Sequence, residues 1–236
     1  MCAKKSKPLR HPPEGGYARG DETRQRIIDA AIQVFGEQGF DAATTRQIAI
    51  RAGVNPPALQ YYFENKEGVY YACIEWMAEE SCRYFQPTIE KINRLNNHEI
   101  DADACIELFC QLLDVMLERV FNTTIPQGKI LFHARAQVGQ GPADAFRLMR
   151  ERISGKLNCA AASLVARVSG AAVHDELTQI RTMTLMGQAV IFHLTRHSML
   201  DQLGWEEVNA ERLTLLKTTL RVQCRTLMES WRAASQ

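Results

Sequence analysis

Two short helical segments separated by a tight turn constrain this sequence more than any other feature. Thr44 and Gln47 have the spacing of a capping box, in which each side chain accepts a hydrogen bond from the other residue's backbone amide, so a helix should begin after Thr44. Gly53 can end that helix, and Pro56 suits the first position of the next one. Two short helices joined by a three-residue turn with glycine are typical of a helix-turn-helix.

A longer helix is predicted before this pair. Asp21 can cap its start, and its apolar stripe ends at Phe35. Gly39 then suits the left-handed position that ends a helix. In such a helix end the residue after the glycine contacts the last turn, so Phe40 should pack against Phe35.

Helical periodicity continues almost to the C-terminus. Apolar residues recur at steps of three and four, and no segment alternates as a half-buried strand would. We therefore predict an all-α chain. The predicted helices cover residues 22–38, 45–52, 56–62, 66–94, 103–121, 127–137, 142–168, 175–199 and 206–232.

Composition excludes several classes of protein. Apolar residues make up 46% and charged residues 23% of the 236 residues, which is close to an average soluble protein and unlike a disordered chain. No run approaches the ~18 apolar residues of a membrane-spanning helix. The N-terminal segment lacks the apolar run of a signal peptide, so we expect a cytoplasmic protein. The seven cysteines lack CxxC spacing, which favours reduced thiols partly packed in a core.

Packing leaves one side of the two short helices unused, and that side is polar and aromatic. Phosphate donors and base-edge readers are mixed on it, which fits a DNA major groove. Residues 1–66 also carry ten Lys and Arg against seven Asp and Glu, a net charge of +3. The predicted DNA-binding residues are Thr45, Arg46, Asn55, Pro56, Pro57, Ala58, Gln60, Tyr61, Tyr62 and Lys66.

Three divisions are expected along the chain. Residues 1–20 combine three prolines and three glycines with five lysines and arginines, a composition that does not order itself. We expect a disordered basic arm there, either an inert leader or a segment that contacts DNA phosphate. Residues 21–67 should form the helix-turn-helix domain, and residues 68–236 a second helical domain.

The segment 23–74 resembles the N-terminal domain of the TetR family of transcriptional regulators, without a gap. The residues that carry the resemblance are Ala30-Ala31, Phe35, Gly39-Phe40, Thr44-Thr45, Ile48-Ala49, Ala52-Gly53-Val54, Leu59, Tyr62-Phe63 and Lys66-Glu67. Gln60 departs from the pattern, because many members carry an aromatic residue there, often tyrosine. An amide at this position can instead bond an adenine edge.

The resemblance has further implications. Segments 71–80, 129–141 and 185–205 are similar to the subfamily typified by CecR, which is associated with drug-export genes. It implies that Lys66 contacts a DNA phosphate, and it places an effector pocket and a dimer surface in the C-terminal region.

Two C-terminal segments carry an unusual amount of apolar surface. The last helix has an apolar stripe over five turns, and the helix before it is apolar nearly all round. Pairing both with their copies would form a four-helix dimer interface; a single monomer core is the alternative. A homodimer also suits the two half-sites of a palindromic operator. The predicted interface residues are Met183, Gly187, Val190, Leu194, Leu213, Leu216, Leu220 and Leu227.

Further apolar residues suggest a pocket for a small apolar or amphipathic effector. Methionine side chains adapt to varied ligands, although such stripes also form plain cores. Arg135 could anchor a polar group of the ligand. The predicted ligand-binding residues are Phe109, Leu112, Met116, Phe132, Arg135, Phe146, Met149 and Met183.

These patterns lead to one leading hypothesis, a ligand-responsive repressor that binds double-stranded operator DNA. A helix-turn-helix protein controlled by a protein partner is the alternative. No enzyme is expected, because the sequence has no phosphate-binding glycine loop and no G-x-S-x-G elbow. His193 and His197 have the spacing of some zinc ligands, but no third ligand can be named, so neither a metal nor a cofactor is expected.

Overall fold

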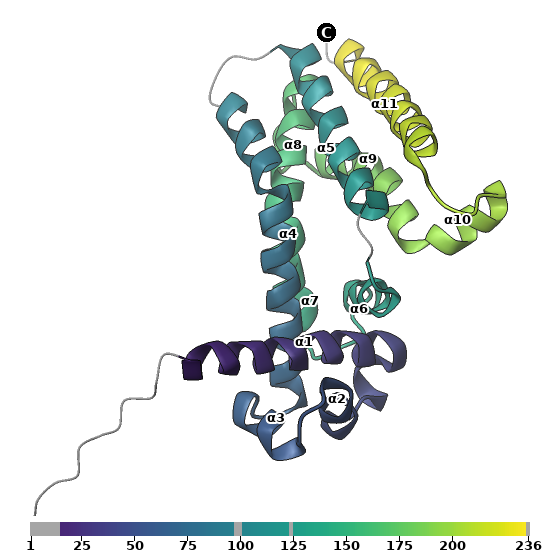
Figure 1. The fold of residues 1–236 in the computed structure, drawn as a ribbon. Coiled ribbons are helices and arrows are strands. Elements are labelled where there is room, and N and C mark those ends of the chain that lie inside the picture. The colour runs from purple at the N-terminus through teal and green to yellow at the C-terminus, as the bar shows by residue number, and fades with distance from the viewer. Residues whose placement is uncertain (1–14, 97–100, 123–124, 235–236) are drawn as a thin grey trace, which may run out of the picture.

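The computed structural model describes residues 15–96, 101–122 and 125–234, and the regular elements in these ranges are helical (Figure 1). The all-α prediction is confirmed. The helices are α1 (Gly15–Ala42), α2 (Thr45–Ala52), α3 (Pro56–Tyr62), α4 (Lys66–Asn96), α5 (Ala102–Asn122), α6 (Gln127–Gln137), α7 (Ala145–Met149), α8 (Gly155–Ser169), α9 (Glu176–Leu194), α10 (Arg196–Leu203) and α11 (Ala210–Ala233). A π-helical turn, η1 (Arg150–Ser154), joins α7 to α8.

The helix-turn-helix forms through the local contacts that its sequence predicts. Thr44 Oγ1 accepts a hydrogen bond from the Gln47 amide at 3.2 Å, and Gln47 Oε1 accepts one from the Thr44 amide at 2.9 Å. Gly53 ends α2 in the left-handed conformation, with φ 65° and ψ 35°. Pro56 is the first residue of α3. The capping box and both helix boundaries are therefore confirmed.

The start of α1 differs from the prediction. This helix begins at Gly15, so residues 15–20 are helical rather than part of a disordered arm. Asp21 consequently lies inside the helix and does not cap it. Residues 15–20 hold no proline, so no missing amide stops the helix there, although three of the six are glycine and their intrinsic propensity does not explain the extension. Residues 1–14 lie outside the described ranges.

Gly39 ends the first helical stretch with a backbone conformation that differs in part from the prediction. Gly39 has a positive φ of 82°, as expected, but its ψ of 170° is extended rather than left-handed helical. That combination is essentially restricted to glycine. The predicted contact still forms, because the Phe35 and Phe40 ring centroids lie 5.9 Å apart.

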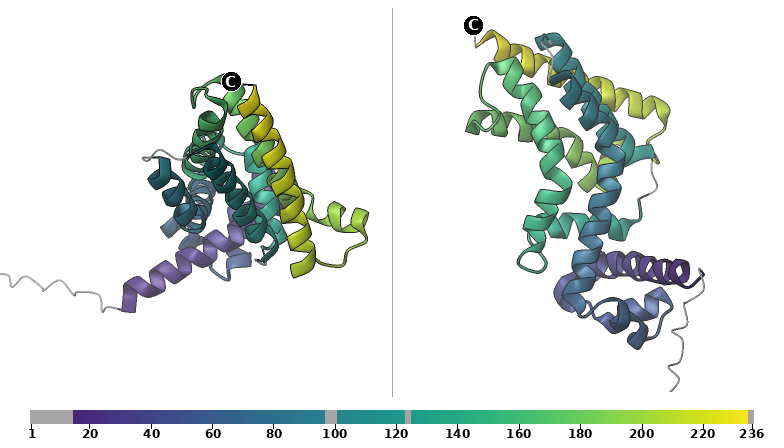
Figure 2. Two further views of the ribbon diagram at one scale, coloured as in Figure 1. Left: turned by 90° about the horizontal axis from the view of Figure 1, so that it is seen from above. Right: turned by 90° about the vertical axis from the view of Figure 1, so that its left-hand side faces the viewer.

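The long helix α4 connects the lower part of the molecule, which holds α1 to α3, with an upper part built on α5, α8, α9 and α11 (Figures 1 and 2). Pro87 lies within it. Proline has no amide hydrogen to donate and crowds the preceding turn, so it bends helices. The upper end of α4 leans away from its lower part in Figure 1, as Pro87 would cause.

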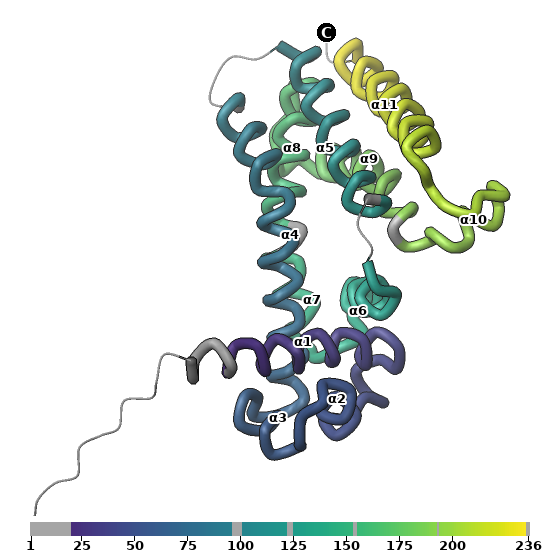
Figure 3. Tube along the Cα trace, viewed as in Figure 1, coloured from purple at the N-terminus to yellow at the C-terminus, as the bar shows by residue number. Residues whose placement is uncertain are grey.

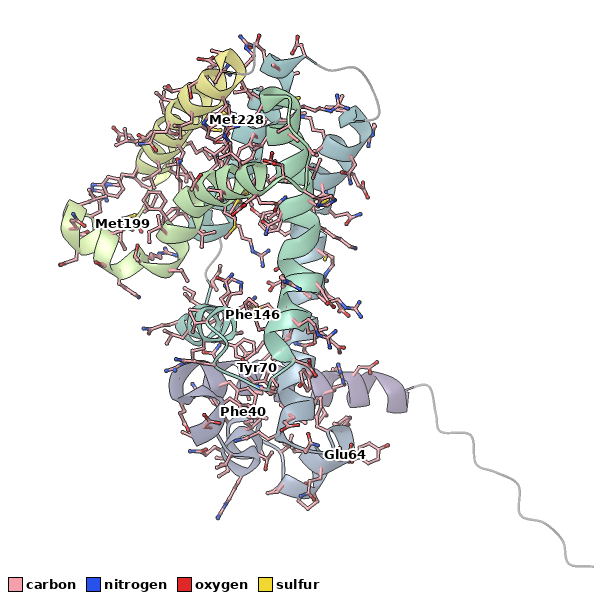
Figure 4. The ribbon with its side chains drawn as sticks, turned by 180° about the vertical axis from the view of Figure 1, so that it is seen from behind. Phe40, Glu64, Tyr70, Phe146, Met199 and Met228 are labelled. Atoms are coloured by element: carbon pink, nitrogen blue, oxygen red, sulfur yellow. The ribbon has the colours of Figure 1, made fainter. Side chains whose placement is uncertain are left out.

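Buried apolar side chains form two clusters, one toward each end of the molecule. The lower core combines α1, α2, α3 and the first half of α4 with Phe132 of α6 and Met149 of α7. The upper core combines α5, α8, α9 and α11 with the last turns of α4. Figure 4 shows this separation: Tyr70 lies in the lower part, and Met199 and Met228 lie in the upper part.

Helix α6 is fixed against α1 by a contact between two glycines. A Cβ atom placed on Gly36 would lie 1.9 Å from the carbonyl oxygen of Gly128, so the helices approach too closely for any other residue at Gly36. Arg135 Nε adds a hydrogen bond to the Gly36 carbonyl at 3.0 Å. Packing therefore assigns α6 to the lower core, although it follows residue 67 and falls in the predicted C-terminal domain.

Helix α11 is held against α5 by ion pairs beside the upper core. Arg221 pairs with Glu107 at 3.0 Å and with Asp114 at 2.7 Å, and Lys217 pairs with Glu118 at 2.5 Å. In Figure 3, α9 passes behind α5, and α10 and α11 follow at the right-hand side of the upper part. One face of α11 is thereby directed toward α5, and the opposite face is left exposed.

Candidate nucleic-acid interface

The helix-turn-helix presents a polar surface because its apolar side chains are used inside. Ile48, Ala49 and Leu59 are buried in the lower core, and Val54 packs against it. Of the predicted DNA-binding residues, Arg46, Asn55, Pro56, Pro57, Gln60 and Tyr61 are exposed, and Thr45, Ala58, Tyr62 and Lys66 are half-buried. Their contacts with DNA remain predictions.

The two tyrosines at the end of α3 have different surroundings. Tyr61 is 84% exposed. Tyr62 is half-buried; its hydroxyl lies 3.8 Å from where a Cβ on Gly20 would be, so it extends to α1. The rings meet edge to face, with centroids 5.2 Å apart. Tyr61 is therefore the tyrosine better placed for a phosphate, while Tyr62 supports α3 from behind.

Asn55 has a structural task that the sequence analysis missed. Its Oδ1 accepts a hydrogen bond from the Ala58 amide at 2.8 Å and so caps α3. Asparagine is among the best helix caps, and its position directly before Pro56 was the available signal. The cap uses the side-chain oxygen and leaves the Nδ2 amide as the donor toward DNA.

Lys66 also has a structural role. Its ammonium group donates to the carbonyl oxygens of Phe40, Asp41 and Ala43 at 2.9, 3.3 and 3.1 Å. The nitrogen also lies 4.4 Å from the centroid of the Phe40 ring. These contacts stabilise the turn between α1 and α2. An ammonium group has three hydrogens, so this geometry does not support the phosphate contact that the resemblance implied.

We expect Lys66→Met to destabilise the protein by about 1–3 kcal/mol, because charge-assisted hydrogen bonds to the turn carbonyls are lost. Urea unfolding measures this change. The salt dependence of operator binding should stay as in the parent protein. A slope reduced by about 0.9 in log–log units, without loss of stability, would instead restore the phosphate contact.

The residues predicted to bind an effector do not come together in one place. Phe109, Leu112 and Met116 are buried in the upper core, whereas Phe132 and Met149 are buried in the lower core. The remaining three are also dispersed: Phe146 and Met183 are exposed, and Arg135 is bonded to α1. Helical apolar spacing identifies buried faces but not the core to which each belongs. This set does not form one ligand site.

The predicted dimer residues divide into inner and outer groups. Leu213, Leu216 and Leu220 are buried in the upper core, and Val190 packs against it, so the regular stripe of α11 serves the protomer itself. This corrects their assignment to the dimer surface. Met183, Gly187, Leu194 and Leu227 are exposed.

A second apolar stripe was not recognised in the sequence. On α9, Leu177, Ile180 and Ile191 are exposed beside Met183, at steps of three to eight residues that keep one helix face. On α11, Leu215 and Val222 are exposed, seven residues apart. The seven-residue spacing of Leu215 and Val222 was readable, but the deeper Leu213 series masked it. We call these exposed residues of α9 and α11, together with Leu194, the outer stripe; Leu227 lies at the edge of the inner series of α11.

Two other expectations can be compared with the structure only in part. The predicted helix 175–199 is interrupted at Thr195, so His193 lies in α9 and His197 in α10 rather than on one face of a single helix. Within the described residues, no group of three His, Cys, Asp or Glu side chains is placed to hold a metal. No helix in the described part of the chain is long and apolar enough to cross a membrane.

Comparison with known proteins identifies two matching family models. Residues 27–73 match the bacterial regulatory proteins of the tetR family, and residues 106–230 match the C-terminal domain of the HTH-type transcriptional dual regulator CecR. CecR of Shigella flexneri is 31% identical over 204 residues, which cover 86% of this chain and 89% of CecR. The regulator SrpR of Pseudomonas putida is 53% identical over 49 residues, covering 21% of this chain and 23% of SrpR.

Solved structures share the fold at low sequence identity. A transcriptional regulator of Pseudomonas aeruginosa PAO1 superposes with a TM-score of 0.65 and 12% identity, covering 95% of this chain and 100% of that one. The fatty acid degradation regulator FadR of Bacillus halodurans gives a TM-score of 0.52 and 17% identity, covering 92% and 96%. At these identities the likeness concerns the fold alone.

Proposed function

Because this chain belongs to the TetR family of transcriptional regulators and is of the CecR type, we propose that it is a repressor that a small molecule releases from a palindromic operator. The family consists of DNA-binding regulators and not of enzymes. One observation supports DNA binding by this chain: α2 and α3 pack on the lower core while Arg46, Gln60 and Tyr61 are exposed. In a helix-turn-helix the second helix enters the major groove with such side chains free to reach the DNA.

The outer stripe supports a homodimer. Met183 is 67% exposed, and Val222 is 61% exposed, values that are high for large apolar side chains on long helices. A Cβ on Gly187 would meet nothing within 4 Å, so the middle of α9 offers room for close approach of another helix. Two copies of α9 and α11 can cover these faces in a four-helix interface. The helix-turn-helix of each copy then binds one of the two half-sites.

The proposed repressor is released from DNA by a small molecule and controls genes for drug export. The fold neighbour FadR of Bacillus halodurans is a fatty acid degradation regulator, and the relative CecR is a transcriptional dual regulator. The CecR resemblance makes drug-export promoters the first targets to examine. Control by a protein partner is the alternative that the experiment must separate.

The decisive experiment selects operator DNA from a random duplex pool with the full-length chain. A palindromic consensus is expected, bound by a dimer. Compounds are then screened for release of the selected operator. Recovery of a single, non-repeated half-site would contradict the dimeric repressor. A palindrome that no compound releases, but that a cellular protein fraction does release, would favour the protein-partner alternative.

Arg46→Ala and Gln60→Ala should each relax base preference at one position of the selected operator. A bidentate contact to a base edge contributes about 1–3 kcal/mol of discrimination, so the preferred base should lose roughly 5- to 150-fold of its advantage. Repeating the DNA selection with each variant measures this. Glu64→Ala, which removes an exposed side chain just beyond α3, is the control and should leave the consensus unchanged. Uniform weakening across all sequences would assign the two residues to phosphate contacts instead.

A further inference from the structure

A positively charged cluster lies where α4, α5 and α6 meet. Lys129 of α6 and Arg119 of α5 both pair with one carboxylate oxygen of Glu80 on α4, the latter at 3.7 Å. Both cations are mostly covered, with side-chain exposures of 13% for Lys129 and 18% for Arg119, whereas Glu80 is 35% exposed. Two cations therefore share one anion, and the anion is the member most open to solvent.

Aromatic rings surround the same cluster. Trp76, Glu80 and Tyr84 are spaced four residues apart and so share one face of α4. The Lys129 nitrogen lies 4.6 Å from the Trp76 ring centroid, and the Arg119 guanidinium lies 4.9 Å from that of Tyr84. Aromatic rings thus stand on both sides of the Glu80 carboxylate, and each ring contacts one of the two cations.

The two cations of the cluster are held away from water by several groups. Removing a guanidinium from water carries a desolvation penalty, and Arg119 meets it with the Glu80 carboxylate, the Ser81 hydroxyl and the Tyr84 ring. Burial lowers the pKa of Arg119, and the Glu80 carboxylate acts in the opposite direction. A second anion would gain from charge-assisted hydrogen bonds with both cations.

We propose that this cluster, at Glu80, Arg119 and Lys129, binds the carboxylate of an aromatic carboxylic acid, with Glu80 occupying that position until the ligand displaces it. The ligand's ring packs between Trp76 and Tyr84 while its carboxylate pairs with Lys129 and Arg119. The inference rests on the proposed function, because it assigns the effector its chemical class and its site. Lys129 directly follows Gly128, so a ligand that moves Lys129 acts on the glycine contact with α1.

The first test measures direct binding in the absence of DNA. Sodium 4-phenylbutyrate is the probe, and 4-phenylbutyramide is its neutral match. Calorimetry with the full-length dimer should show binding of the carboxylate and at least tenfold weaker binding of the amide. The probe should also change tryptophan fluorescence, and the Trp76→Phe variant should lose that change while Trp205 and Trp231 still emit. Equal affinity for acid and amide, or no binding at millimolar concentration, would overturn the proposal.

Three variants locate the site. Lys129→Gln should weaken 4-phenylbutyrate binding by about 10- to 100-fold, the loss expected for a charge-assisted hydrogen bond. Lys217→Gln is the matched control, because Lys217 likewise pairs with a glutamate, Glu118 of α5, but from the α11 side, and it should bind as the parent does. Glu80→Gln should tighten binding by up to about fivefold, since it removes the resident charge and keeps the shape. A misfolded variant does not gain affinity, so unchanged or weaker binding by Glu80→Gln counts against the site.

Operator release separates this inference from the proposed function. If the probe binds and Lys129→Gln abolishes both binding and release, both stand. If another compound releases the operator equally from the parent and from Lys129→Gln, the repressor stands and this site falls. If the chain selects no operator at all, the proposed function fails, while calorimetry still decides whether the carboxylate site exists.

Discussion

Gly36→Ala should separate α6 from α1 and destabilise the lower core by about 2 kcal/mol or more. The new methyl group would stand 1.9 Å from the Gly128 carbonyl oxygen, which is backbone and has no rotamer by which to escape. Overpacking costs about 1–3 kcal/mol and sometimes more, while alanine returns at most ~1 kcal/mol of helix propensity. Urea unfolding measures the loss, and hydrogen exchange of the α6 amides should show earlier opening.

A second glycine provides the control for this experiment. Gly68 lies in the first turn of α4, and a Cβ there would meet only the Asn65 side chain, at an ordinary 3.5 Å. Gly68→Ala should therefore be neutral or slightly stabilising. If Gly36→Ala behaves like Gly68→Ala, with α6 still protected from exchange, the glycine contact does not hold the helices together.

Ile191→Asp should convert the dimer into a monomer and reduce operator affinity by about 10²–10⁴-fold. Ile191 is 50% exposed in the outer stripe of α9, and the proposed interface would place the new carboxylate against apolar side chains of another copy. An isolated charge in such an interface is strongly unfavourable. Linking two binding modules raises affinity by about 10²–10⁴, and a monomer forfeits that gain.

Sedimentation velocity and titration of the selected operator measure the two effects together. Val138→Asp is the control, because Val138 is 72% exposed but follows α6, away from the outer stripe. That variant should remain dimeric and bind normally. A dimeric Ile191→Asp protein with parental operator affinity would place the subunit interface elsewhere.

The features predicted correctly from sequence are those that neighbouring residues determine. The Thr44–Gln47 capping box, the left-handed Gly53 and the start of α3 at Pro56 depend on groups within a few residues of one another. Their energetics are local, so the sequence order contains the interacting partners. The Phe35–Phe40 contact follows for the same reason, even though Gly39 takes a different ψ.

Tertiary placement was not available from the same patterns. Leu213 and Leu215 are two residues apart in one helix, yet the first is buried in the upper core and the second is exposed in the outer stripe. Phe109 and Phe132 were expected in one pocket and are buried in different cores. Apolar periodicity indicates that one face of a helix is buried. Which other helix buries that face depends on contacts between residues distant in the chain.

Lys66 illustrates a further limit. Its partners are the backbone carbonyls of residues 40, 41 and 43. Every residue has a backbone carbonyl, so no residue type in the sequence indicates this contact. The Glu80–Lys129 pair was hidden in another way, because its members are 49 residues apart and belong to helices whose crossing the sequence does not specify.

The membership of α6 in the lower core bears on the construction of hybrid regulators. A designer who wishes to graft a new sensor onto this DNA-binding head would naturally join the chains after residue 67 or 73, where the matched family model ends. Such a junction would place Gly36 opposite a foreign residue at the position of Gly128. A working graft must therefore bring a glycine at that position, or retain α6 from this chain as part of the head.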